Sequence, residues 1–124
     1  MSFWEYYKMV EDGTLVKLEE FKRNQELKER VKQGILGMIK VLRDEISIVI
    51  SYSSYEDAIW KLMKMNIISP LLAQELMDIY SLVENLDKID DEILYGMLVR
   101  IMEDIEEAII SINRYKKEKR SLMS

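Results

Sequence analysis

Apolar residues recur along most of this chain at intervals of three or four positions, which is the spacing of one face of an α-helix. The longest such run extends from Leu15 to about Ile50, and another follows Asp90 for roughly 28 residues. Two shorter segments between them carry the same pattern. The pattern therefore predicts an all-α protein, built as an antiparallel bundle of four main helices.

Capping residues mark where the later helices begin and end. Ser54 can accept a hydrogen bond from the free amides at the start of a second helix, and Asn66 can end that helix in the left-handed conformation. Ser69 followed by Pro70 predicts the start of a third helix, because proline at the first helical position has no N–H to leave unpaired. Asp90 is expected to cap the last helix.

A short helix is expected ahead of the long one, from Phe3 to Val10. Gly13 should end this short helix, and the hydroxyl of Thr14 should cap the helix that follows. The long helix is expected to bend or break near Arg23-Asn24.

Two glycines, Gly34 and Gly37, lie inside the long helix. Each costs about 1 kcal/mol relative to alanine in a helix interior. Close approach of a neighbouring helix is a physical reason for glycine at such positions. We therefore expect another helix to pack tightly against this part of the chain.

The 124 residues are near the commonest size for a single domain. We expect residues 1–13 to form the short helix and a turn, and residues 14–115 to form the bundle. Residues 116–124 are expected to form a basic C-terminal tail.

Histidine and cysteine are both absent from the chain. Their imidazole and thiolate groups supply most proton transfer near neutral pH, much nucleophilic catalysis and most transition-metal ligation. We therefore expect no enzyme activity, no metal site and no cofactor. The missing cysteines also exclude disulfide bonds.

The net charge of −5 repels nucleic acid on average, so nucleic acid is not an expected partner. No apolar run reaches the roughly 18 to 20 residues needed to cross a bilayer. The segment Met1-Ser2-Phe3-Trp4-Glu5 lacks the basic-then-apolar order of a signal peptide. These features favour a cytoplasmic protein with no membrane partner.

Carboxylates cluster on the last predicted helix, at Glu103, Asp104, Glu106 and Glu107. A carboxylate-bridged di-metal bundle normally adds Glu-x-x-His pairs at inward positions, and this chain has no histidine. We therefore interpret the four acids as a solvated helix face.

Two groups of side chains are candidates for binding a partner. Five basic residues lie near the end of the last helix, where they can contact phosphate or acidic protein, or balance the negative end of the helix dipole. An aromatic group opens the chain; a short helix cannot bury it alone, so it must pack on the bundle, which we favour, or on another subunit. The candidates are Phe3, Trp4, Tyr7, Arg114, Lys116, Lys117, Lys119 and Arg120.

Nine methionines could form an adaptable binding surface, but most, including Met38, Met63, Met97 and Met77, fall on or beside apolar stripes. We expect them to fill the core. Tyr52 and Tyr55 are interpreted as packing residues with polar tips.

Three segments, in their order and spacing, resemble the HEPN superfamily, in particular its small prokaryotic branch of toxin-like ribonucleases paired with minimal nucleotidyltransferases. They are Ser54-Tyr55-Glu56, Asn66-Ile67-Ile68-Ser69-Pro70 and Asp87-Lys88-Ile89-Asp90-Asp91-Glu92. The resemblance extends from about Val31 to Tyr115. It implies a HEPN-like helical bundle that forms a homodimer, with a nucleotidyltransferase-like protein as a partner.

Active members of this family carry an arginine, usually followed by asparagine, and a histidine a few residues later, and these side chains meet across a dimer to cleave RNA. Alignment on residues 87–92 places that motif on residues 79–84. Ile79 then replaces the arginine, Tyr80 follows it, and Glu84 replaces the histidine. The charges around the site are Glu84, Asp87, Asp90, Asp91 and Glu92 against Lys88, a field that should repel RNA.

The leading hypothesis is therefore a non-catalytic, HEPN-like helical bundle that serves as a protein-binding or assembly module and forms a homodimer. One alternative is a ribonuclease or nucleotide-handling enzyme of a HEPN toxin-antitoxin-like system with an atypical site at Glu84. Another is an unrelated helical adaptor whose likeness to the family reflects generic bundle patterning.

Overall fold

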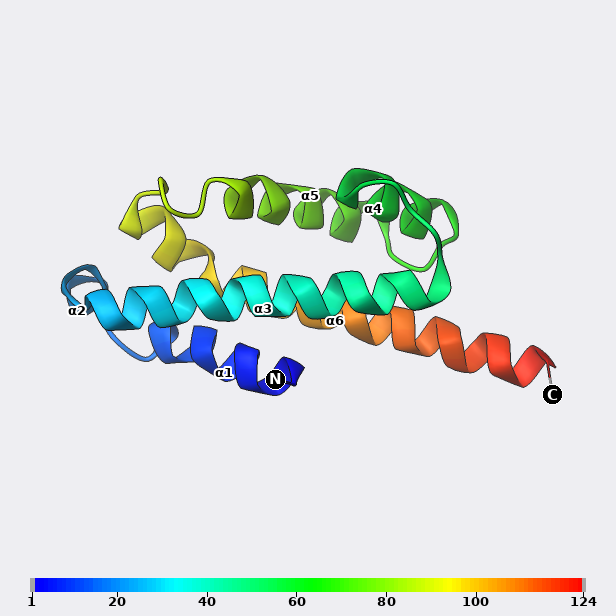
Figure 1. Ribbon diagram of the computed structural model, residues 1–124, viewed down its shortest axis with the longest axis horizontal. Helices are drawn as coiled ribbons and strands as arrows, with labels where there is room; N and C mark the ends of the chain where they lie inside the picture. Colours follow the sequence, from blue (N-terminus) through cyan, green and yellow to red (C-terminus); the bar gives the residue numbers. More distant parts are fainter. Residues whose placement is uncertain (1, 124) are drawn as a thin grey trace.

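The computed structural model describes residues 2–123, and its secondary structure is entirely helical within that range. The all-α prediction is thus confirmed. The helices are α1 (Phe3–Thr14), α2 (Leu18–Arg23), α3 (Gln25–Val49), α4 (Tyr55–Lys64), α5 (Pro70–Glu84) and α6 (Asp91–Met123) (Figure 1).

Helices α3 and α6 form the middle of the bundle, with α1 on one side of them and α4 and α5 on the other (Figure 1). The two long helices run in the same direction. Near their first turns Lys28 Nζ lies 3.1 Å from Asp91 Oδ2, and near their other ends Lys116 Nζ lies 2.7 Å from Glu45 Oε2. Helices α1 and α5 run opposite to this pair. Since α3 and α5 are themselves opposite, the intervening α4 cannot be antiparallel to both, so the predicted alternation of successive helices is incomplete.

Helix α1 packs against α3 where the sequence contains Gly34 and Gly37, as expected. A Cβ atom at Gly34 would lie 2.8 Å from the carbonyl oxygen of Tyr6, and one at Gly37 would collide with the Tyr6 ring. Gly13 has a similar role and does not end the helix as predicted. It is buried inside α1, and a Cβ there would lie 2.7 Å from Val31 Cγ2.

Polar caps define the helix ends. The side chain of Asn24 accepts from the Leu27 amide at the start of α3 and breaks the long helix where the sequence predicted. The Ser54 and Ser69 side chains cap α4 and α5, and Asn66 has a positive φ of 60° after α4. These three predictions are confirmed.

The predicted cap at Thr14 is wrong. Thr14 is the last residue of α1, and its hydroxyl donates to the carbonyl oxygen of Glu11 at 2.7 Å instead of accepting from the next helix. Lys17 holds the capping position of α2, with no side-chain hydrogen bond. The segment Leu15–Lys17 is therefore a connection and not the start of a long helix.

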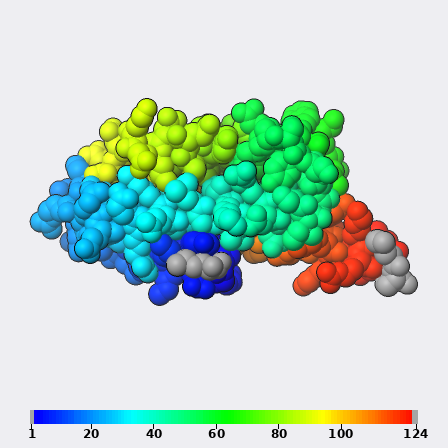
Figure 2. Space-filling view, viewed as in Figure 1, coloured from blue at the N-terminus to red at the C-terminus, as the bar shows by residue number. Residues whose placement is uncertain are grey.

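Helix α6 is 33 residues long, which exceeds the predicted length. Its C-terminal turns stand clear of the rest of the bundle (Figures 1 and 2). Most of the segment that was predicted as a basic tail is helical, and Ser124 lies outside the described residues. None of the helices in residues 2–123 combines the length and apolar character that a bilayer-spanning segment needs.

Candidate functional site

The three positions that the resemblance aligns with the HEPN motif lie on α5, and their side chains do not converge on one point. Ile79 has no exposed surface and belongs to the hydrophobic core. Tyr80 is partly buried and stacks on Tyr55, with ring centroids 4.3 Å apart and planes inclined by 10°. Glu84 is exposed at the last turn of the helix. Only Glu84 of the three presents a charged group to solvent.

Tyr55 is a buried packing residue with a polar tip, as expected. Its hydroxyl donates to the carbonyl oxygen of Leu76 at 3.4 Å. Burial raises the pKa of Tyr55 well above its ordinary value, and the neighbouring Tyr80 raises it further. The phenol therefore stays protonated and is almost completely shielded from solvent.

Glu84 lines an open hollow of about 450 Å³ between α3 and the turn that follows α5. Its lining residues are Glu29, Lys32, Gln33, Leu36, Val83, Glu84, Asn85, Leu86, Asp87 and Lys88. Two lysines and three carboxylates thus share a shallow polar surface, and no hydrogen bond of Glu84 to either lysine is present in the described structure.

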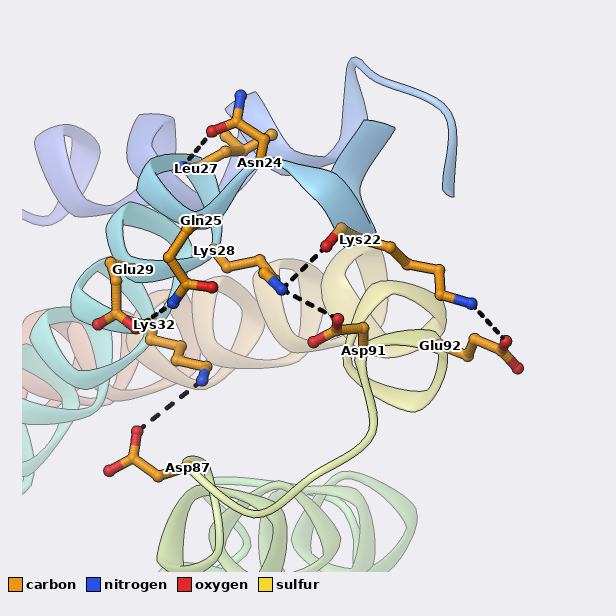
Figure 3. A network of polar contacts seen from close by, with 10 residues as sticks. All are labelled: Lys22, Asn24, Gln25, Leu27, Lys28, Glu29, Lys32, Asp87, Asp91 and Glu92. Carbon is orange, nitrogen blue, oxygen red and sulfur yellow. Dashed lines mark hydrogen bonds and ion pairs between the residues drawn. The ribbon is translucent and has the colours of Figure 1, made fainter. Parts of the chain in front are cut away.

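The expectation that Lys88 alone opposes the acids of this region is wrong. Lys28 Nζ pairs with Asp91 and Lys22 Nζ with Glu92, both at 3.1 Å, and Lys32 Nζ lies 3.8 Å from Asp87 (Figure 3). The sequence near the motif does not contain these three lysines. They reach it because α2 and the first turns of α3 pack beside the start of α6.

The aromatic candidates form one cluster at the start of α1. The Trp4 ring lies 5.1 Å from both Phe3 and Tyr7, centroid to centroid, and Trp4 is 60% exposed. Phe3, Tyr6 and Tyr7 are partly buried against the core. Three of the four rings therefore pack on the bundle, and Trp4 remains at the surface.

The basic candidates lie on the final turns of α6, beyond the N-terminal end of α1 (Figure 1). Lys116 is held by the ion pair with Glu45, and Lys119 Nζ lies 5.9 Å from the centre of the Tyr115 ring. Lys116, Lys119 and Arg120 line a hollow of about 210 Å³ with Ile48, Val49 and Tyr115. Arg114 and Lys117 line a separate one with Ile110 and Asn113.

One of the acids assigned to a solvated face is in fact buried between α5 and α6. Only 6% of Asp104 is exposed, and its Oδ2 atom has no hydrogen-bond partner among the described residues. Arg100 lies 3.7 Å from Asp104, Glu75 and Asp78. Burial, and after it the neighbouring Glu75 carboxyl, raise the pKa of Asp104 to about 7, while Arg100 acts in the opposite direction.

The Asp104 carboxyl therefore favours its protonated form at a higher pH than an exposed aspartate does. The signal in the sequence was the position of Asp104, three residues after Ile101 and four before Ala108 on the apolar stripe. The absence of histidine and the position of the four acids between core isoleucines favour a solvated face when the sequence alone is considered. No group of three or more acidic side chains within residues 2–123 is arranged to hold a metal ion.

A second surface that the sequence reasoning missed is a groove of about 360 Å³ between α4 and α5. Trp60, which is 56% exposed, forms part of one wall. Met63 and Met77 line this groove half-buried instead of filling the core, whereas Met38 is fully buried as expected. The complete lining is Glu56, Ile59, Trp60, Met63, Pro70, Ala73, Gln74 and Met77.

The chain was compared with protein-family models, with curated proteins and with solved structures. None of the three comparisons gives a match.

Proposed function

We propose that this chain is a HEPN-like helical binding and assembly module, that it acts as a homodimer, and that it has no ribonuclease activity. The observation that carries this proposal is the complete burial of Ile79. A side chain at that position points into the core and cannot reach the phosphate of a bound nucleic acid.

The surroundings of Glu84 support the same conclusion. A general acid or base must lie within hydrogen-bonding reach of the proton it transfers, and a ribonuclease also needs a positive field that collects the phosphate backbone. Glu84 shares its hollow with Glu29 and Asp87, and Lys32 is directed toward Asp87. Lys32 thus pairs with the turn after α5, and Lys22 and Lys28 pair with the first turn of α6.

The surface instead exposes tryptophan side chains, which are common in protein interfaces. Tryptophan is enriched at the centres of such interfaces, and Trp4 and Trp60 are both more than half exposed. The resemblance implies a nucleotidyltransferase-like partner in addition to a second copy. Phe3, Trp4 and Tyr7, together with the basic end of α6, remain the candidate contacts for that partner.

Two measurements test the proposal. The purified protein at tens of micromolar should have twice the mass of one chain by light scattering, and a clean monomer would contradict the homodimer. Incubation with mixed RNA should leave the RNA intact for both the wild-type protein and Glu84→Ala. Cleavage that is lost in Glu84→Ala would overturn the assignment as a non-catalytic protein.

A further inference from the structure

Helix α4 has one face in the core and a regular stripe on the opposite face. Tyr55, Ala58, Ile59 and Leu62 are buried, whereas Glu56, Trp60 and Lys64 are exposed. The three exposed residues are spaced by four, so they lie in one row along the helix. The Lys64 ammonium group lies 5.7 Å from the centre of the Trp60 ring.

This stripe has an internal symmetry of charge. An acid and a base lie at equal distances on either side of Trp60, each about 6 Å along the helix axis at 1.5 Å per residue. A two-fold axis that passes through Trp60 perpendicular to α4 exchanges the two ends of the helix. In such a pair, Glu56 of one copy faces Lys64 of the partner subunit, and Lys64 faces the partner's Glu56.

The groove between α4 and α5 lies directly beside this row and is lined mainly by apolar groups. Trp60 forms part of its wall, and the partly buried Met63 and Met77 supply flexible walls. Methionine adapts its shape to an inserted side chain more readily than branched residues do. The groove can therefore accept the indole ring of a second copy.

We propose that a second copy of this chain docks on α4, with the two α4 helices antiparallel and the Trp60 of each copy anchored against the α4–α5 groove of the other. This inference rests on the homodimer proposed above and identifies its interface. An isologous contact requires a surface that is complementary to itself, and the Glu56–Trp60–Lys64 row meets that requirement.

Net charge also favours a second copy at this surface. Two chains of net charge −5 repel one another on average. Contact is therefore favoured at a surface whose charges sum to zero and whose acid and base can each pair with the opposite charge on the partner. The row of Glu56, Trp60 and Lys64 carries one negative and one positive charge.

The test is a charge-reversal cycle read by the mass of the protein in solution. Glu56→Lys alone and Lys64→Glu alone each place like charges together at two symmetric contacts. Each should raise the dissociation constant of the dimer about tenfold. The double variant should return to within about threefold of the wild type, because both pairs are again opposite in sign.

A mixture of the two single variants adds a sharper test. One chain then carries two positive groups in the row and the other two negative groups, so heterodimers should outnumber both homodimers when one chain carries a mass tag. Asp44→Lys is the matched control, because Asp44 is an exposed acid on α3 that pairs with Lys40 within its own helix. It should leave the dimer unchanged.

The outcomes separate failure of the interface from failure of the proposed function. If the wild-type protein is a monomer, the homodimer and this interface both fail. If the wild type is a dimer and Glu56→Lys, Lys64→Glu and Trp60→Glu all remain dimers of unchanged affinity, this interface is wrong while the homodimer stands. Circular dichroism of every variant confirms that the helices are intact, since Glu56 also lies in the first turn of α4.

Discussion

The contact between α1 and α3 gives a prediction whose sign can be worked out from the structure. In the variant Gly34→Ala, the new Cβ atom would lie 2.8 Å from the Tyr6 carbonyl oxygen and from Val10 Cγ2, and 2.9 Å from Met9 Cβ. The Tyr6 oxygen and the Met9 Cβ belong to or adjoin the backbone of α1. Neither can turn aside, so α1 as a whole must move away from α3.

The expected magnitude combines two opposing terms. Alanine is favoured over glycine in a helix interior by about 1 kcal/mol. Overpacking of a well-filled core typically costs about 1–3 kcal/mol, and the rigid obstruction here places Gly34→Ala toward the upper part of that range. We therefore expect a net loss of about 1–2 kcal/mol in the free energy of unfolding.

Gly96 provides the matched control on α6. It is exposed, and a Cβ atom there would have no neighbour within 4 Å. Gly96→Ala should thus raise the free energy of unfolding by about 0.5–1 kcal/mol through helix propensity alone. Urea denaturation followed by circular dichroism gives both values from the shift in midpoint at constant slope. Equal stabilisation by the two substitutions would refute the tight packing of α1 on α3.

Three further predictions concern other parts of the fold. Because burial raises the pKa of Asp104 to about 7, folding favours its protonated form, and this contribution to stability is lost as the pH rises from 3.8 through about 7. Asp104→Asn should remove that loss and be about 1–3 kcal/mol more stable than wild type at pH 8; an unchanged pH profile would contradict the raised pKa of Asp104. Ile79→Arg, which introduces the arginine of the family, should cost about 3–5 kcal/mol by burying an unpaired charge, and adding Glu84→His should not produce RNA cleavage. A stable, cleaving variant would show that position 79 can reach solvent. Ser69→Ala should lower stability by about 1 kcal/mol through loss of the hydrogen bond to the Leu72 amide, whereas the exposed Ser81→Ala should change it by less than about 0.5 kcal/mol in the same urea assay.

Local chemistry determined the features that the sequence predicted well. Ser54, Ser69 and Asn66 act on backbone groups within a few residues, so their roles do not depend on the rest of the fold. Gly34 was also interpretable, because glycine inside a strong helical pattern has a cost that close packing explains. The role of Gly13 was not interpretable from the sequence, because a glycine beside a polar turn can either end a helix or make room for a neighbouring helix. The packing of the neighbouring helix decides between these two roles.

The charges and neighbours of the candidate site depend on tertiary contacts, which the spacing of apolar residues along the sequence does not predict. The lysines that pair with Asp87 and Asp91 come from α3, more than fifty residues earlier in the chain. The raised pKa of Asp104 depends in part on Glu75, which lies on another helix. Trp60 was not recognised as a surface residue because a helical pattern identifies the buried face of α4 but not the groove that α5 forms beside it.

The exposed aromatic surface also sets the strength of the dimer that we propose. A tryptophan side chain can bury up to about 250 Å², so covering the exposed 56% of Trp60 in both copies contributes about 6 to 7 kcal/mol at 25 cal/mol per Å². Bringing two proteins together costs about 4–15 kcal/mol in lost translational and rotational freedom. Trp60 alone therefore does little more than offset association, and the groove methionines and the two ion pairs must supply the remainder. A dimer with so small a surplus is weak, so the measured mass should fall toward that of one chain as the protein is diluted below tens of micromolar.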